Sequence, residues 1–326
     1  ERLFGRRLAD FFTGRDPRGG NVDTTIVPRV QQAGWDAMQQ GCPDGPCKGA
    51  VVAVEPSTGR ILALVSSPGF DPNLLSSHDL SAQSAAWQQL RDDPNSPLTN
   101  RAISERYPPG STFKVITTVA ALQNGLTEDE QLTAAPSIPL PDSTATLENY
   151  GGTPCGAAPT ASLREAFARS CNTAFVELGL RLGVDALRSA AGSFGFDSDP
   201  EPIPLQVSES TVGPIPDRAA VAMSSIGQKD VSVTPLQNAL IAATIANGGV
   251  MMKPFLVQRI INAQGEDVQV FEPQRVRRVV SEATATTMTE LLCGVVERGT
   301  GMPARIPGLA IAGKTGTSQQ ITEGKY

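Results

Sequence analysis

Histidine, lysine and aromatic side chains are scarce in this sequence of 326 residues. It has a single histidine, His78, only six lysines, and aromatic residues make up 5% of the chain. A serine hydrolase with a histidine base would have to use His78. Its neighbours Ser76, Ser77 and Asp79 indicate a solvated loop instead. Because lysine is rare here, a lysine at a special position is informative.

Other functional classes are also poorly supported. The formal net charge is −6 and the isoelectric point about 5.0, which argues against nucleic acid as a partner. The five cysteines and the single histidine never form a cluster with metal-ligand spacing, so we expect neither a metal nor another cofactor. No run of 18 apolar residues indicates a membrane span, and no signal peptide is recognisable.

Two of the cysteines bracket a turn sequence. Cys42 and Cys47 enclose Pro-Asp-Gly-Pro, which can bring its two ends together in a disulfide. A disulfide would imply an oxidising, extracytoplasmic location. Two free thiols fit this spacing equally well, so the sequence leaves both interpretations open.

Strand-like stretches lie toward both ends of the chain with helix-like stretches between them, which predicts an α+β fold. Two apolar runs, residues 49–55 and 60–66, flank a Gly-containing turn and predict a buried β-hairpin. Residues 161–192 hold helical stretches broken at Gly183, residues 131–160 are mainly loop, and residues 310–313 lead into a strand. Apolar spacing predicts further helices over 28–40, 112–124, 234–247 and 283–297.

The first motif with chemical potential is PPGSTFK at residues 108–114. The prolines and glycine end any preceding element, and a helix then begins near Ser111. Lys114 lies three residues later and therefore on the same helix face as the Ser111 hydroxyl. A neutral lysine amine there can accept the serine proton. Alone, Ser-x-x-Lys is as consistent with chance as with catalysis.

The second motif is Ser170-Cys171-Asn172, at the end of a predicted helix. A hydroxyl and an amide two residues apart fit a proton relay and a grip on a substrate carbonyl. Serine and asparagine are also good helix-end caps, and this alternative interpretation is open.

The third motif is KTGTS at residues 314–318. Gly316 lets a substrate backbone approach a strand closely, while Lys314, Thr315 and Thr317 can hold a carboxylate. The backbone N–H groups of Thr317 and Ser111 could form an oxyanion hole. The alternative is a plain edge strand that ends in a turn.

The three motifs are more informative together than singly. They occur in the order Ser-x-x-Lys, Ser-x-Asn, Lys-Thr-Gly, which is the set found in penicillin-binding proteins and class A β-lactamases. The flanking sequence extends the likeness over nearly the whole chain. It resembles class B penicillin-binding proteins, in particular their actinobacterial A-type members, through segments that include PSTGRILAL at 56–64, FDPN at 70–73, TPLQ at 234–237 and ANGG at 246–249.

The resemblance implies a transpeptidase fold of the serine β-lactamase type, with a five-stranded antiparallel sheet flanked by helices and a helical subdomain. It implies a peptidoglycan D,D-transpeptidase in which Ser111 is the nucleophile and Lys114 its base. Ser170 and Asn172 would line the opposite wall, and Lys314, Thr315, Gly316 and Thr317 would bind the donor's terminal carboxylate. The expected ligands are D-Ala-D-Ala stem peptides and β-lactams. The expected partners are a membrane glycosyltransferase and division proteins.

The resemblance also implies a domain division and a location. Residues 1–48 would end an N-terminal pedestal, and residues 49–326 would form a transpeptidase domain that lacks its last strands and C-terminal helix. An N-terminal anchor, absent from this chain, would hold the protein at the outer face of the cytoplasmic membrane. There Cys155 and Cys171 could pair and brace the active-site wall.

Two other functions remain open at this point. A D,D-carboxypeptidase or β-lactamase on the same scaffold would pass the acyl group to water. A non-catalytic β-lactam sensor would use acylation as a signal.

Overall fold

The computed structural model describes residues 20–42, 45, 47–76 and 79–318 of the chain. His78 and the ends of the chain, residues 1–19 and 319–326, lie outside this part. None of the helices in the described part is long and apolar enough to cross a membrane.

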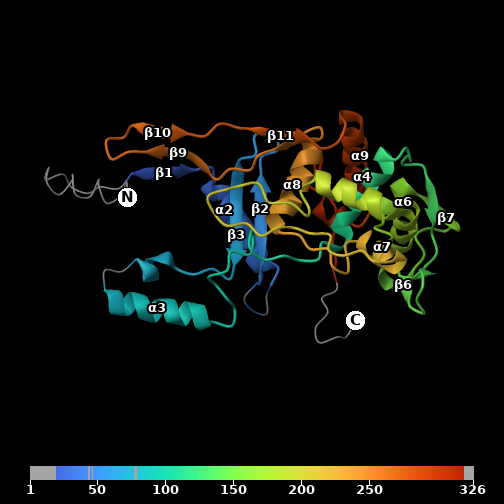
Figure 1. Cartoon of the computed structure of the whole chain (residues 1–326), viewed down its shortest axis with the longest axis horizontal. Helices are drawn as coiled ribbons and strands as arrows, with labels where there is room; N and C mark the ends of the chain where they lie inside the picture. The colour runs from blue at the N-terminus through green and yellow to red at the C-terminus, as the bar shows by residue number, and fades with distance from the viewer. Residues whose placement is uncertain (1–19, 43–44, 46, 77–78, 319–326) are drawn as a thin grey trace.

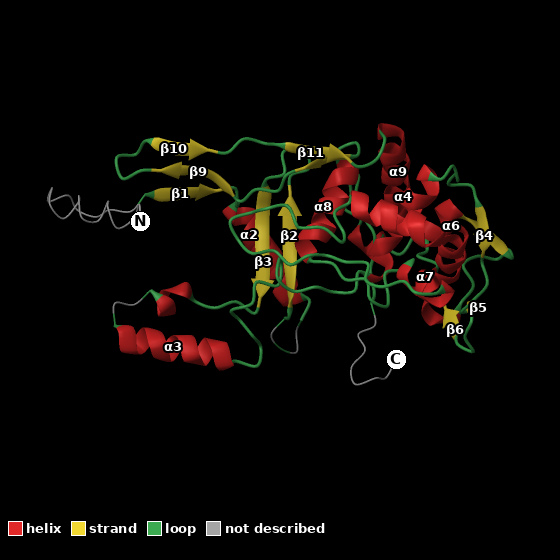
Figure 2. Cartoon of the chain, viewed as in Figure 1, coloured by secondary structure: helices red, strands yellow, loops and turns green. Residues whose placement is uncertain are grey.

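Two bodies can be distinguished in the chain, a β-rich one and a helical one (Figures 1 and 2). The β-rich body centres on the antiparallel hairpin of β2 (Gly49–Val54) and β3 (Ile61–Ser67), on which α2 (Pro28–Gln40) and α8 (Pro235–Ala246) pack. β3 alternates between buried and half-buried residues, and β2 is half-buried throughout. The hairpin was therefore predicted correctly in its place, but it is less buried than expected.

Ribbons of short strands extend the β-rich body. β1 (Asn21–Thr24), β9 (Val257–Ile261) and β10 (Asp267–Val270) form a three-stranded antiparallel sheet in the order β1-β9-β10. β8 (Val250–Met252) pairs with β11 (Arg275–Arg278). The helix α3 (Leu80–Asp92) and the 3₁₀ turn η1 (Pro72–Leu75) stand away from the hairpin on the same side as this sheet, and α3 buries no residue (Figure 1).

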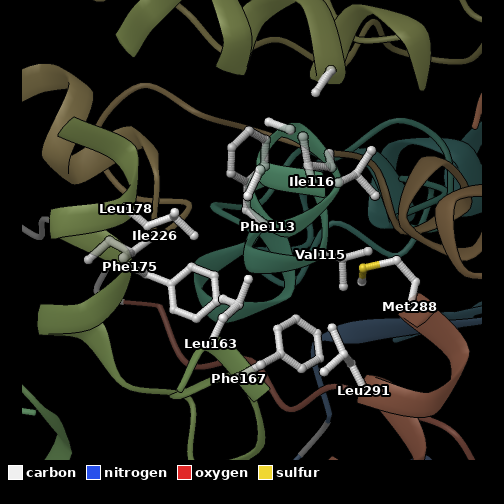
Figure 3. Close-up of a cluster of buried hydrophobic side chains, with 14 of the residues drawn as sticks. Phe113, Val115, Ile116, Leu163, Phe167, Phe175, Leu178, Ile226, Met288 and Leu291 are labelled. Atoms are coloured by element: carbon white, nitrogen blue, oxygen red, sulfur yellow. The ribbon is translucent and has the colours of Figure 1, made fainter. Parts of the chain in front are cut away.

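The helical body holds most of the core. α4 (Lys114–Gln123), α5 (Leu163–Ala168), α6 (Asn172–Ser193) and α9 (Glu282–Arg298) surround a cluster that includes Phe113, Phe167 and Phe175 (Figure 3). Ten residues of α4 run without an acidic group, and eight of them are buried. α7 (Arg218–Ser224) packs on α6. This well-packed cluster fixes the start of α4, where the first motif lies.

The segment predicted as loop over residues 131–160 has more structure than expected. β4 (Gln131–Thr133) pairs with β7 (Thr160–Ser162), and β5 (Ser137–Pro139) with β6 (Thr146–Glu148). The turn η3 (Tyr150–Gly152) follows β6. Gly183, with φ +80°, interrupts α6 as predicted. The short 3₁₀ turns η2 (Gly110–Phe113) and η4 (Met302–Ala304) complete the elements.

Two expectations about the sheet are wrong for the described residues. The hairpin β2–β3 is two-stranded, not part of a five-stranded sheet. Residues 309–318 form no strand, since no strand of the described part pairs with them. The Gly313 N–H donates to the Leu292 carbonyl on α9, with N and O 3.2 Å apart, and the Thr315 hydroxyl pairs with Thr300.

Candidate active site

The start of α4 presents the first motif as the sequence predicts. Ser111 lies in the 3₁₀ turn η2, half-buried, and Lys114 is the first residue of α4. Within the described residues the Ser111 hydroxyl has no hydrogen-bond partner, so it is free to attack a ligand. Lys114 is fully buried and its Nζ lies 5.3 Å from the centroid of the Phe175 ring.

The Lys114 amine is held by the second motif. Nζ lies 2.8 Å from the Ser170 carbonyl oxygen, 2.8 Å from Asn172 Oδ1 and 3.4 Å from Ser170 Oγ. The two nearer atoms can only accept hydrogen bonds. A neutral amine satisfies both with its two N–H groups and keeps a lone pair for a proton. The arrangement therefore suits a lysine that acts as a base.

Burial and charge favour that neutral form. Desolvation, followed by the nearby Lys314 ammonium, lowers the pKa of Lys114 well below its usual 10.5. Two aromatic rings supply apolar walls to the lysine pair. Phe175 lies next to Lys114, and the ring centroid of Phe167 lies 5.8 Å from Lys314 Nζ. Such a strongly shifted amine, three residues after a serine with an unpaired hydroxyl, is typical of a catalytic site.

A second lysine, which belongs to the third motif, donates a hydrogen bond to Ser170. Lys314 Nζ donates to Ser170 Oγ over 2.7 Å and to the Thr315 carbonyl over 3.1 Å. Burial lowers the pKa of Lys314 to about 7. The Ser170 hydroxyl thus lies between two amines and can pass a proton from one to the other.

Ser170 reaches this position through a rare backbone conformation. Its φ is +59°, which costs a residue with a side chain roughly 1–2 kcal/mol. Its N–H donates to the Phe167 carbonyl, and the next residue, Cys171, donates to the Ala166 carbonyl. Cys171 is also joined to Cys155 in a disulfide. These hydrogen bonds and the disulfide hold the left-handed turn, in which both oxygens of Ser170 point toward the lysines.

The third motif lies against the start of α4. A side chain at Gly110, which has φ +52°, would place its Cβ 2.3 Å from the Thr317 carbonyl oxygen. One at Gly316 would lie 2.9 Å from a methyl of Thr112. Thr315, Gly316 and Thr317 are exposed and so can be reached by a ligand. Within the described residues, the N–H groups of Ser111 and Thr317 donate no hydrogen bond, as an oxyanion hole requires.

Three supporting contacts were not predicted. Gly227, with φ +72°, accepts a hydrogen bond from the Gly110 N–H over 3.0 Å and leaves no room for a Cβ. Thr300 Oγ1 lies 2.6 Å from Thr315 Oγ1. The Glu148 carbonyl accepts from the Asn172 amide over 3.0 Å. The sequence carries no local signal for the last two, because each joins segments through a single polar contact.

All eight predicted site residues are thereby placed around the first turn of α4. The structure also joins Cys42 to Cys47, away from this site, and leaves Cys293 as a free thiol. His78 lies outside the described residues and cannot be placed.

Comparison with known proteins gives the family. Residues 49–326 match the family model of the penicillin binding protein transpeptidase domain. The chain is 67% identical over 325 residues to peptidoglycan D,D-transpeptidase PbpA of Mycobacterium tuberculosis, covering 100% of this chain and 66% of that protein. It is 64% identical over 323 residues to PbpA of Mycolicibacterium smegmatis, covering 99% and 65%.

A solved structure gives the same result. The penicillin G acyl-enzyme complex of penicillin-binding protein A from M. tuberculosis superposes with a TM-score of 0.92 at 67% identity, covering 99% of this chain and 73% of that one. The chain spans slightly less than two thirds of the length of the two curated relatives. It belongs to the penicillin-binding protein transpeptidase family, among the class B proteins of the mycobacterial PbpA type.

Proposed function

We propose that the chain is the catalytic part of a peptidoglycan D,D-transpeptidase. The observation that carries the proposal is the Ser170 hydroxyl between Lys114 and Lys314, with Ser111 three residues before Lys114 in the turn η2. The 67% identity to a D,D-transpeptidase supports it. A β-lactam acyl-enzyme is known for the same relative.

The proposed reaction has two halves. Ser111 Oγ attacks the carbonyl of the donor's penultimate D-Ala, and Lys114 takes the hydroxyl proton. The developing oxyanion is held by the N–H groups of Ser111 and Thr317. The peptide C–N bond then breaks and D-Ala leaves with a proton returned through Lys114 and Ser170. An acceptor amine attacks the acyl-enzyme, loses its proton by the same route, and releases Ser111.

The donor's terminal carboxylate needs a cationic site. Lys314 when protonated, with the hydroxyls of Thr315 and Thr317, forms such a site in the exposed part of the third motif. Gly316 leaves the backbone open there. We assign these four residues to carboxylate binding. We assign Asn172 to holding the Lys114 amine, and Ser170 to passing a proton between Lys114 and Lys314.

The cellular setting follows from the same proposal. Residues 49–326 would be the transpeptidase domain, which is the range of the family match, and residues 1–48 the end of a pedestal. Two disulfides suit the oxidising outer face of the cytoplasmic membrane. A relative of 28% identity occurs in a peptidoglycan synthase complex that couples polymerization and crosslinking. This relative supports a membrane glycosyltransferase as a proposed partner, and division proteins are proposed from the family resemblance alone.

The function is tested by measuring whether the acyl group of a donor is transferred to an amine acceptor or to water. The chain is incubated with a donor that ends in D-Ala-D-Ala, or its thioester analogue, and with a D-amino acid as acceptor. A transpeptidase joins donor to acceptor with release of the leaving group. Release with hydrolysis alone would favour a carboxypeptidase. Rapid β-lactam hydrolysis would favour a β-lactamase, and acylation without any peptide turnover would favour a sensor.

A further inference from the structure

A buried asparagine outside the three motifs lies behind the second one. Asn149 follows β6 and is 7% exposed. Its amide Nδ2 donates to the Ala135 and Thr153 carbonyls, each over 3.0 Å, and its backbone N–H donates to the Pro136 carbonyl over 2.9 Å. Its side chain therefore uses both donors and is fixed in one orientation.

The remaining atom of that amide reaches the helix that carries Asn172. Oδ1 accepts from the Thr173 N–H over 3.0 Å, and the Thr173 hydroxyl lies 3.3 Å away. This N–H is in the first turn of α6 and has no partner within the helix. Asn149 thus caps α6 from a segment 24 residues earlier, immediately beside the second motif.

The same segment determines which way the Asn172 amide points. Asn172 Nδ2 donates to the carbonyl of Glu148, the residue before Asn149, over 3.0 Å. Its Oδ1 is thereby left facing Lys114 Nζ at 2.8 Å. If the amide were reversed, its N–H groups would face the N–H groups of the lysine. The lysine would lose one of its two close acceptors.

We propose that Asn149 is a positioning residue for acylation, which holds the Glu148 carbonyl and the start of α6 so that Asn172 keeps its oxygen on Lys114. This inference rests on the proposed acyl-transfer function. It assigns the role to the side-chain amide of Asn149, which touches neither the nucleophile nor the lysines.

A double-variant cycle tests it. The second-order rate of acylation by benzylpenicillin is measured for the chain and for Asn149→Ala, Asn172→Ala and the double variant. We expect Asn149→Ala to be slower by roughly 10- to 100-fold, as a small misplacement of a catalytic group produces. Because Asn149 acts through Asn172, the double variant should be no slower than Asn172→Ala beyond a factor of about two.

A matched control separates a loss of positioning from a general loss of stability. Asn247 also donates its amide to a backbone carbonyl, that of Val250 over 2.9 Å, at the end of α8. Asn247→Ala should lower the thermal midpoint without slowing acylation. If Asn149→Ala does not fold, Asn149→Ser replaces it, since it brings no charge into the buried site and its single short hydroxyl cannot make all the side-chain bonds of the asparagine.

Two results would overturn the inference. One is an Asn149 variant that is acylated as fast as the unmodified chain. The other is a double variant slowed by the full product of the two single effects. Failure of the unmodified folded chain to be acylated at all would instead remove the proposed function.

Discussion

Lys314 Nζ donates a hydrogen bond to Ser170 Oγ over 2.7 Å, and so links the third motif to the second. The same hydroxyl is 3.4 Å from the amine of Lys114. Two ammonium groups this close to one hydroxyl, in an apolar surrounding, disfavour each other's charge. One lysine can therefore act as a base while the other stays available as a cation.

Replacing the proposed base should slow acylation strongly without unfolding the chain. Lys114→Met keeps an unbranched side chain of similar length in the buried site but has no amine. We expect the rate of β-lactam acylation to fall by roughly 10²–10⁴-fold, the usual contribution of a general base. Circular dichroism should show an unchanged fold. A Lys114→Met rate within a few-fold of the unmodified chain would contradict the assignment.

The acylation rate should depend on pH through Lys314. Its pKa is lowered to about 7 by burial, so its cationic form is lost as the pH rises through that value. Carboxylate binding by the free protein, and hence the second-order acylation rate, should fall between about pH 7 and pH 9. Lys114, whose pKa is lowered well below 10.5, acts in its neutral form, so its loss of a proton with rising pH would raise the rate and does not cause this fall.

An arginine at the same position provides the control. Lys314→Arg stays charged over this range, so its profile should remain flat where that of the unmodified chain falls. A rate that stays level or rises with pH in the unmodified chain would show that a charged Lys314 is not needed for binding.

Gly110 should not tolerate a side chain. Its φ is +52°, and a Cβ would meet the Thr317 carbonyl oxygen at 2.3 Å. Gly110→Ala should therefore displace the third motif from the nucleophile and slow acylation by roughly 100-fold. The control is Gly125→Ala, where φ is +84° but no atom lies within 4 Å. It shares the backbone strain of about 1 kcal/mol and should leave the acylation rate unchanged. Equal effects of the two variants would exclude the close contact as the cause.

The disulfide at the second motif should stabilise the site. Cys155 and Cys171 are separated by 16 positions, and a loop of about this size typically contributes roughly 3 kcal/mol. Cys155→Ala with Cys171→Ala should lower the free energy of unfolding by about that amount and slow acylation. Cys42→Ala with Cys47→Ala removes the disulfide outside the site and should not change the acylation rate.

Thiol titration of the unfolded, non-reduced chain checks the pairing directly. With Cys293 as the free cysteine, one thiol per chain should react. Mass mapping that finds Cys155 and Cys171 both unpaired would remove this prediction.

Much of the site could be predicted because its chemistry is concentrated in short motifs. Ser111 and Lys114 lie one helical turn apart, so local spacing alone places them on one face. The hairpin and the long helices also follow from apolar patterns. The start of α4 differs in detail, because η2 is a 3₁₀ turn before the α-helix proper.

The rest depends on contacts that local patterns do not encode. Residues 310–313 were expected to lead into a strand, yet a strand needs a ladder partner, and no strand of the described part pairs with this segment. The turn at Ser170 is held by local backbone bonds to Phe167 and Ala166, but it places a serine in the left-handed conformation that usually takes glycine. The support from Asn149 joins segments 24 residues apart. Propensity indicates neither.

The most direct test of the central claim is the intact mass of the chain after incubation with benzylpenicillin, measured beside Ser111→Ala. The account predicts one persistent adduct of one drug molecule on the unmodified chain and none on the variant. An adduct of the same size and persistence on Ser111→Ala would contradict it, because the nucleophile would then lie elsewhere.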